Sequence, residues 1–142
     1  MALAIRLLPA EPDIKVKTGA YVHWHREEMM ARAIEQGFTH QMMIDADLIF
    51  PVDGISKLAS LDADIGYATY NRKNRQYAEQ LKTPAGFMLV KLDAAKKIAM
   101  PRFRCDFGTG EDNYFFGQAL EAGLKVVCDN SLHIDHIGKG IY

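Results

Sequence analysis

The stretch MMIDADLIFP, residues 42–51, constrains the fold of this chain more than any other part of its sequence. It opens with three apolar residues, and such a short run is typical of a strand buried on both faces. Asp45 and Asp47 follow with one residue between them. Because alternate residues of an extended chain point the same way, we expect both carboxylates to face one space. Open α/β sheets bind ligands at this carboxyl end of the strands.

The chemistry of the D-x-D pair indicates a cation site. Two close carboxylates repel each other unless a cation lies between them or one of them takes a proton. Their hard oxygen atoms suit Mg²⁺ or Mn²⁺. The alternative is that Asp45 caps a turn and Asp47 is solvated, since D-x-D alone is a common pattern. Its position directly after an apolar strand favours the ligand site.

Length and charge restrict the class of protein. The chain has 142 residues, which suits one domain spanning residues 1–142. Its formal net charge is −1 and its isoelectric point about 6.5. Without a long run of one charge sign, nothing points to a nucleic-acid partner. Cys105 and Cys128 form no C-x-x-C pattern, which favours free thiols in a reducing compartment. We therefore expect a cytoplasmic protein without a transmembrane segment.

Apolar patterns alternate between strand and helix along the chain. This alternation predicts an α/β sandwich with a largely parallel sheet. A polar loop is expected between the third and fourth strands, at residues 71–84. Strands are predicted at residues 3–8, 40–44, 64–70, 86–90, 125–128 and 131–137, and helices from residue 22 to Gly37, after Pro51, at residues 93–98, and from Glu111 to Gly123.

Two adjacent acids, Glu111 and Asp112, begin the last predicted helix. Acids at this position favour the helix dipole, and that structural role is sufficient to explain them. A carboxylate there can also act as a general base if an acceptor hydroxyl lies within hydrogen-bond reach. Adjacent helical residues point about 100° apart, so we expect only one of the two acids to face the crevice at the carboxyl end of the strands. Asp112 lies three residues before Phe115 and four before Phe116, and we expect it to share their inward face.

Two histidines near the end of the chain are three residues apart. On a strand, His133 and His136 point to opposite faces, so at most one reaches a given site. A single histidine is more often a core or surface residue than a ligand, but a glycine two residues after His136 allows close approach of a ligand. Tyr21 and Trp24 are expected to be packing residues rather than stacking platforms.

Three segments occur in a recognisable order and cover most of residues 26–138: HREEMMARAIEQGFTHQMMIDADLIFP, AGFMLVKLDAAKKI and GEDNYFFGQALEAGLKVVCDNSLHIDHIG. Their order resembles that in the family 2-like glycosyltransferases with a GT-A fold. The resemblance implies a Rossmann-like three-layer sandwich and transfer of a sugar from a nucleotide-sugar donor to an acceptor hydroxyl, with inversion. Asp112 of the E-D pair matches the catalytic base of inverting members, with Glu111 beside it. Mn²⁺ or Mg²⁺ would lie on the donor diphosphate, with Asp45, Asp47 and His136 as ligands, and Asp45, Arg26, Gly86 and His136 would contact the donor.

One departure from the family is the short segment before the D-x-D. About forty residues precede Asp45, which is less than two β-α units. We therefore expect a GT-A-like domain without its first nucleotide-binding unit. Such a sheet has an open edge and an uncovered apolar face, which predicts a homo-oligomer.

Two other functions remain open. A non-catalytic binding or assembly module with a vestigial site would also explain the short segment before Asp45. A phosphatase of the haloacid dehalogenase type also carries D-x-D after a buried strand, with the first Asp as nucleophile and the second as acid. That family has Thr or Val two residues after the second Asp, where this chain has Ile49, so we place it below the other two.

Overall fold

The structure is a computed structural model that describes residues 11–70, 84–106 and 108–137. The predicted strand at residues 3–8 and most of the predicted loop at residues 71–84 lie outside these ranges. In chain order the described elements are α2 (Val22–Glu35), β1 (His40–Ile44), β2 (Leu48–Ile49), α3 (Gly54–Ala59), β3 (Ile65–Tyr67), β4 (Phe87–Lys91), α4 (Leu92–Ala95), α5 (Glu111–Glu121), β5 (Val126–Cys128) and β6 (Asp135–His136).

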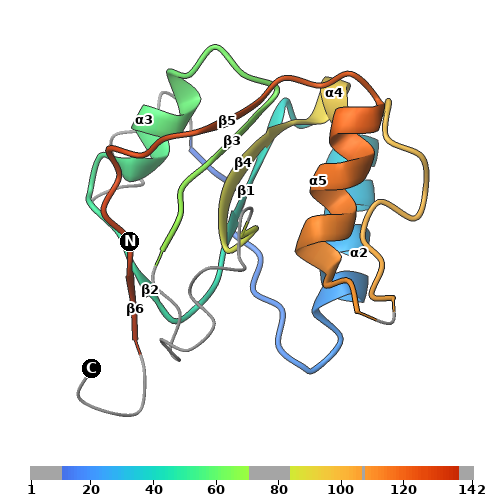
Figure 1. The fold of residues 1–142 in the computed structure, drawn as a ribbon, viewed down its shortest axis with the longest axis horizontal. Coiled ribbons are helices and arrows are strands. Elements are labelled where there is room, and N and C mark those ends of the chain that lie inside the picture. Colours follow the sequence, from blue (N-terminus) through green and yellow to red (C-terminus); the bar gives the residue numbers. More distant parts are fainter. Residues whose placement is uncertain (1–10, 71–83, 107, 138–142) are drawn as a thin grey trace.

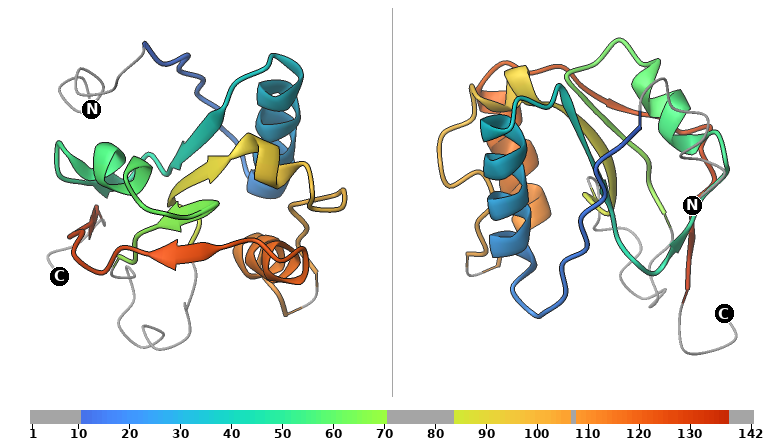
Figure 2. Two further views of the ribbon diagram at one scale, coloured as in Figure 1. Left: turned by 90° about the horizontal axis from the view of Figure 1, so that it is seen from above. Right: turned by 180° about the vertical axis from the view of Figure 1, so that it is seen from behind.

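Helices lie on both faces of a central sheet (Figure 1). α2, α4 and α5 cover one face, and α3 lies on the other, as the view from above also shows (Figure 2). An apolar core lies on each side of the sheet. The larger contains Met30 of α2, Met88 and Val90 of β4, and Phe115 and Phe116 of α5. The smaller contains Ile55 and Leu58 of α3 together with Phe87, Leu132 and Ile134. The α/β class predicted from the sequence is confirmed.

The prediction of a mainly parallel sheet is wrong for the described strands. Their order is β1-β4-β3-β5, and β4 runs antiparallel to both of its neighbours. β3 and β5 form the parallel pair of this sheet. β1 and β3 end where β4 begins, so the chain returns into β4 from the same end of the sheet (Figure 1). Alternating helical and strand patterns do not record strand direction, and a return of this kind gives an antiparallel pair.

Both long helices end at a glycine, as the sequence predicts. Gly37 has a φ of 77° and Gly123 a φ of 76°, a conformation that costs glycine little because it has no Cβ. After α2, the N–H of Gly37 bonds to the carbonyl of Ile34, and the N–H of Phe38 to that of Ala33. Residues 123 and 124 repeat this pattern after α5. These hydrogen bonds satisfy carbonyls that the helix itself leaves unpaired.

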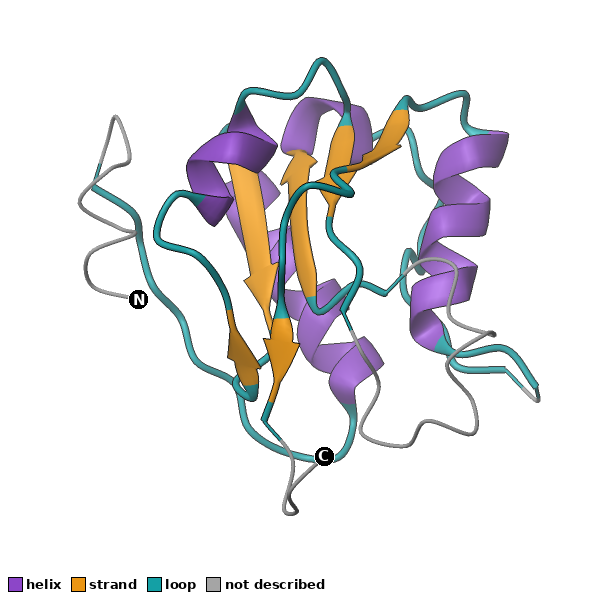
Figure 3. Ribbon diagram, turned by 60° about the vertical axis from the view of Figure 1, so that its left-hand side comes forward, coloured by secondary structure: helices purple, strands orange, loops and turns teal. Residues whose placement is uncertain are grey.

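Two shorter elements differ from the sequence prediction. The strand expected at residues 131–137 is confined to β6, which pairs with β2 in a separate two-stranded sheet (Figure 3). The helix expected at Pro51 begins three residues later, at Gly54, whose N–H bonds to the Pro51 carbonyl. β2 was not predicted, because two residues are too few to show a periodicity.

The parts of the fold that could form a functional site lie at one end of the molecule. The first turns of α2 and α5, the carboxyl ends of β1 and β3, and the beginning of β4 all lie there (Figure 1). Residues far apart in the sequence therefore meet at this end.

Candidate functional site

Arg26, in the second turn of α2, is the centre of the site. Only 5% of its surface is exposed, although it carries a charge. Its guanidinium makes ion pairs with three carboxylates. Nη1 donates to Asp112 Oδ1 at 2.5 Å and to Glu111 Oε1 at 3.3 Å, and Nη2 donates to Asp45 Oδ1 at 3.1 Å. The structure thus brings together Arg26, the first acid of the D-x-D and both acids of the E-D pair.

The charges in this acidic cluster, defined as Asp45, Glu111 and Asp112 around Arg26, are not balanced. Three ionised carboxylates against one guanidinium leave a charge of −3 + 1 = −2. Burial acts to lower the pKa of Arg26, but Asp112, Asp45 and Glu111 more than offset it, and the net pKa is raised. The pKa of Glu111 is also raised, first by burial and then by the charge of Asp112. A ligand that brings positive charge would therefore be favoured here.

Asp112 is held on both of its oxygens. While Oδ1 accepts from Arg26, Oδ2 accepts the backbone N–H of Ala85 at 3.2 Å. Gly110 is the N-cap of α5, so Glu111 and Asp112 occupy its first turn, where the helix dipole favours acids. The stabilising role and the site role are thus compatible.

The expectation that only one of these two acids faces the crevice is wrong. Both reach the same guanidinium nitrogen, and their side chains are similarly sheltered, at 23% exposed for Glu111 and 19% for Asp112. The longer side chain of Glu111 compensates for the different direction of its Cα–Cβ bond. Helical geometry sets where a side chain starts, but the rotamers of a long side chain decide where its charge ends.

Gly86 allows an unusually close approach between neighbours. A Cβ placed on it would overlap the Tyr70 hydroxyl and the Asp45 carboxylate. The backbone N–H of Asp45 bonds to the Gly86 carbonyl at 2.8 Å, which fixes the end of β1 against the beginning of β4. The predicted presence of Gly86 at the site is therefore explained by packing against two polar groups.

Tyr70 belongs to the site and was missed in the sequence. Its pKa is raised, first by burial and then by the negative charges of Asp45 and Asp112, so the phenol stays protonated. Its hydroxyl hydrogen-bonds to the Gly86 backbone, and its ring lies edge-on to His136 with 5.2 Å between the ring centres. Tyr70 is the last residue of the strand predicted at residues 64–70, and this position could have identified it as a candidate site residue.

Asp47 and His136 form a second pair at this end. Nε2 of His136 lies 3.3 Å from Asp47 Oδ2, and the N–H of Ile137 bonds to the Asp47 carbonyl at 2.7 Å. The pairing of β2 with β6 places them together. The side chain of His136 is 17% exposed and that of His133 is 85% exposed. His133 lies before β6, so the two histidines do not share the strand on which both were expected.

The two acids of the D-x-D do not share one space. β1 ends at Ile44 and the chain turns at residues 46 and 47, so Asp45 contacts Arg26 while Asp47 contacts His136. In the part of the chain that the structure describes, no group of three or more His, Cys, Asp or Glu side chains is placed to hold a metal ion. Asp47 and His136 offer two ligands, so further ligands would have to come from a substrate or from water.

A second buried arginine, Arg102, is connected to the site through Glu27 of α2. Arg102 is 7% exposed, and its Nη1 donates to Glu27 Oε1 at 3.0 Å. The backbone N–H groups of Arg102 and Phe103 both donate to Glu27 Oε2. Because Glu27 follows Arg26 directly, the same turn of α2 holds the acidic cluster and the segment that leads to α5.

Comparisons with known proteins support the fold alone. No family model matches the chain, and no curated protein matches it. Among solved structures it is similar to a protein described as "Crystal Structure of A197 from STIV", with a TM-score of 0.66 and 17% sequence identity. The similarity covers 89% of this chain and 72% of that one. None of the helices among the described residues is long and apolar enough to cross a bilayer.

Proposed function

We propose that this protein is a GT-A-like, metal-dependent glycosyltransferase that moves a sugar from a nucleotide-sugar donor to an acceptor hydroxyl with inversion. The observation that supports it best is the junction at Arg26. Asp45 of the D-x-D and the acids of the E-D pair lie on different elements, yet one guanidinium binds all three. The first segment of the family resemblance thus contacts the third through Arg26, and the second contacts the third through the N–H of Ala85, which bonds to Asp112.

Asp112 is the general base in this proposal. As the acceptor oxygen forms its bond to the anomeric carbon, the bond from that carbon to the diphosphate oxygen breaks. The acceptor proton passes to Asp112, and the nucleoside diphosphate leaves with the bonding electron pair. Arg26 and the Ala85 N–H hold the carboxylate in place while leaving a lone pair on each oxygen. Glu111, with its raised pKa, reduces the negative charge beside the base when it is protonated.

Asp47 and His136 would hold Mn²⁺ or Mg²⁺ together with the donor diphosphate, and the cation would offset the charge that develops on the leaving group. A carboxylate and an imidazole are suitable ligands for Mn²⁺ in particular. Gly86 and Tyr70 line the approach to Asp45, and the protonated Tyr70 hydroxyl can donate a hydrogen bond to a phosphate or a sugar.

Calorimetry on the intact chain tests this proposal. We expect a nucleoside diphosphate to bind in the presence of Mn²⁺ and to bind much less without it. Asp47→Ala should remove the dependence on Mn²⁺, and Asp53→Ala, which changes an exposed acid paired with Lys57, should not. Equal binding by the wild type and Asp47→Ala would contradict the role of Asp47.

A non-catalytic module is the second candidate. It is favoured by the absence of a three-ligand metal group among the described residues. It predicts binding of a nucleoside diphosphate or of a nucleotide sugar without release of product. Incubation with a panel of nucleotide sugars and candidate acceptors, followed by measurement of free nucleoside diphosphate, separates the two candidates.

A further inference from the structure

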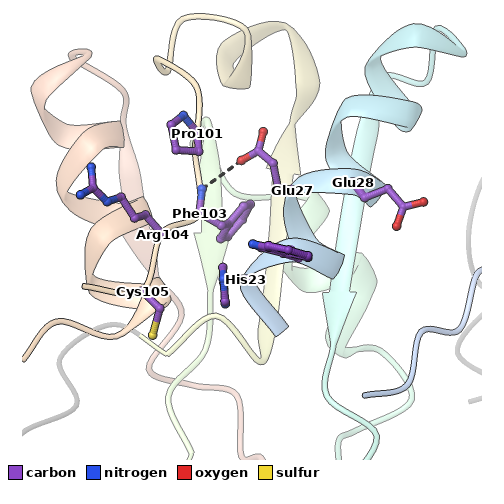
Figure 4. Close-up of a pocket in the computed structure, with 8 residues that line it drawn as sticks. His23, Glu27, Glu28, Pro101, Phe103, Arg104 and Cys105 are labelled. Carbon is purple, nitrogen blue, oxygen red and sulfur yellow. Dashed lines mark hydrogen bonds between the residues drawn. The ribbon is translucent and has the colours of Figure 1, made fainter. Parts of the chain in front are cut away.

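A pocket of about 650 Å³ lies beside α2 (Figure 4), and no member of the acidic cluster lines it. One wall is formed by α2 and the other by the segment that follows the Met100–Pro101 bond. Arg26, one residue along from this wall, points instead to Asp45 and the E-D acids. The pocket is lined by His23, Trp24, Glu27, Glu28, Pro101, Phe103, Arg104 and Cys105. Glu27 and Phe103 also take part in the Arg102 contacts described above, but none of the eight belongs to the acidic cluster.

An exposed aromatic surface lies at this pocket. Trp24 is 68% exposed and Tyr21 64% exposed, which contradicts the expectation that both are packing residues. Their ring centres are 5.6 Å apart with an angle of 30° between the planes, and His23 lies edge-on to both rings. The three rings form one aromatic group, in which Trp24 and His23 line the pocket and Tyr21 lies beside it. Covering such a surface removes apolar area from water, which favours a ligand with an apolar face.

The charges around the pocket are already matched. Glu27 lines the pocket and pairs with Arg102 at 3.0 Å, so a ligand would not need to balance the charge of Glu27. The other two charged lining residues are paired as well, Glu28 with Lys17 at 3.0 Å and Arg104 with Asp106 at 2.7 Å. A charged ligand would have to compete with these pairs, whereas a neutral ligand would not.

Hydrogen-bonding groups remain available for a neutral ligand. The contact of Arg104 with Asp106 uses Nε, and the guanidinium carries four further N–H donors on its two terminal nitrogens. His23 adds a ring that can donate or accept. The pocket thus combines the exposed indole ring of Trp24 with the polar groups of Arg104 and His23.

The wall formed by Glu27 and Phe103 is held in place by hydrogen bonds and by ring stacking. Glu27 accepts hydrogen bonds from the backbone of Arg102 and Phe103, the latter drawn as a dashed line in Figure 4. Phe103 stacks on Phe115 of α5 with 4.4 Å between ring centres and 3° between planes. A preformed pocket lowers the ordering cost of binding.

We propose that this pocket binds a neutral carbohydrate. A sugar ring presents C–H groups on its face and hydroxyls around its edge, which matches an aromatic surface bordered by Arg104 and His23. The volume lies within the range of pockets that hold small ligands, and it is large enough to admit a disaccharide. The proposal does not rest on the proposed function, because it requires neither the donor nor a metal.

Trp24 is the only tryptophan of the chain, so its fluorescence reports directly on the pocket. We expect cellobiose or maltose to cause a saturable change in the emission of the intact chain. Arg104→Ala should weaken the affinity by about tenfold, the loss expected for one or two hydrogen bonds to a charged group. Phe38→Ala should leave it unchanged, because Phe38 is also an exposed aromatic but lies beyond the other end of α2. Calorimetry should show that Trp24→Ala, with an unchanged circular dichroism spectrum, no longer binds the sugar.

Three results would overturn the proposal. The first is the absence of any saturable response to both disaccharides. The second is equal affinity in the wild type, Arg104→Ala and Trp24→Ala, which would place the sugar elsewhere. The third is tighter binding of glucuronate or of tetramethylammonium than of either disaccharide, since this would show that the pocket selects charge.

Discussion

Arg26 and Asp112 are joined by a hydrogen bond of 2.5 Å between Nη1 and Oδ1, although they are 86 positions apart in the chain. This contact ties the beginning of α2 to the beginning of α5. The other terminal nitrogen of Arg26, Nη2, donates a hydrogen bond to Asp45 at the end of β1. The candidate site is therefore part of what holds the sheet and two helices together at one end.

Removal of the Arg26 charge should destabilise the fold. Arg26→Met keeps much of the side-chain volume but leaves three carboxylates without their cation. Breaking a buried pair costs about 3–5 kcal/mol, and exposure lowers that figure, since the Asp45 side chain is 41% exposed. We therefore expect a loss of about 2 kcal/mol or more in the free energy of unfolding, measured in urea near neutral pH. Arg32→Met, on the exposed face of the same helix, should change it by less than about 1 kcal/mol. Equal losses in the two variants would show that the Arg26 ion pairs are not important for stability.

Glu111 should make stability depend on pH. Burial and the charge of Asp112 raise the pKa of Glu111 in the folded protein, so the folded state binds a proton more tightly than the unfolded chain. The stabilising contribution is complete below the unfolded pKa and is lost as the pH rises through the folded pKa. Urea midpoints of the wild type, measured from about pH 4 upward, should show this decrease, and Glu111→Gln should remove it. Glu121→Gln, at the other end of α5, is the matched control. A wild-type profile unchanged by Glu111→Gln would contradict the raised pKa.

The role of Asp112 as a base can be separated from its role in α5. Asp112→Asn keeps the size of the side chain and removes the base. If the proposed transfer occurs, we expect turnover to fall by about 10²–10⁴-fold while donor binding remains. Asp93→Asn, a first-turn acid of α4, should leave turnover unchanged. A lower melting temperature of Asp112→Asn without a specific loss of turnover would show that Asp112 only stabilises the helix.

Two glycine substitutions should have opposite effects. Gly86→Ala places a methyl group against the Tyr70 hydroxyl and the Asp45 carboxylate, and we expect a loss of about 1–3 kcal/mol. Gly117→Ala, inside α5, meets open space and should stabilise by about 0.5–1 kcal/mol. Combining Gly86→Ala with Tyr70→Phe should recover part of the loss, because it removes one of the overlapping atoms. A tolerated Gly86→Ala would mean that the close approach does not constrain the site.

The edge position of β1 among the described strands leads to a prediction about assembly. Among the described strands β1 lies at one edge, and its five residues pair with β4 on one side. We expect a second copy to pair with this edge and give a homodimer, since unpaired edges favour association. Light scattering should then show a mass above that of the 16.0 kDa chain. A monomer mass that persists at high protein concentration would refute this prediction.

Local chemistry was enough to determine several elements of the fold. The apolar run before Asp45 predicted a strand at residues 40–44, and β1 has these bounds. Its expected central position, buried on both faces, is wrong for the described strands, because β1 lies at an edge of the sheet and Met43 is its one buried residue. The glycines at positions 37 and 123 predicted the ends of α2 and α5, because a left-handed residue that closes a helix depends on only a few neighbouring residues.

Contacts between distant residues were decided only by the tertiary structure. The antiparallel direction of β4 depends on how the chain returns between two strands, which a pattern of apolar residues does not encode. The resemblance placed Arg26 near the donor, but its three ion pairs became visible only when α2, β1 and α5 were brought to one end. The same holds for Tyr70, whose position between Gly86 and His136 comes from three separate segments. Local sequence specifies the conformation of each element, whereas a buried charge finds its partners only when the elements pack around it.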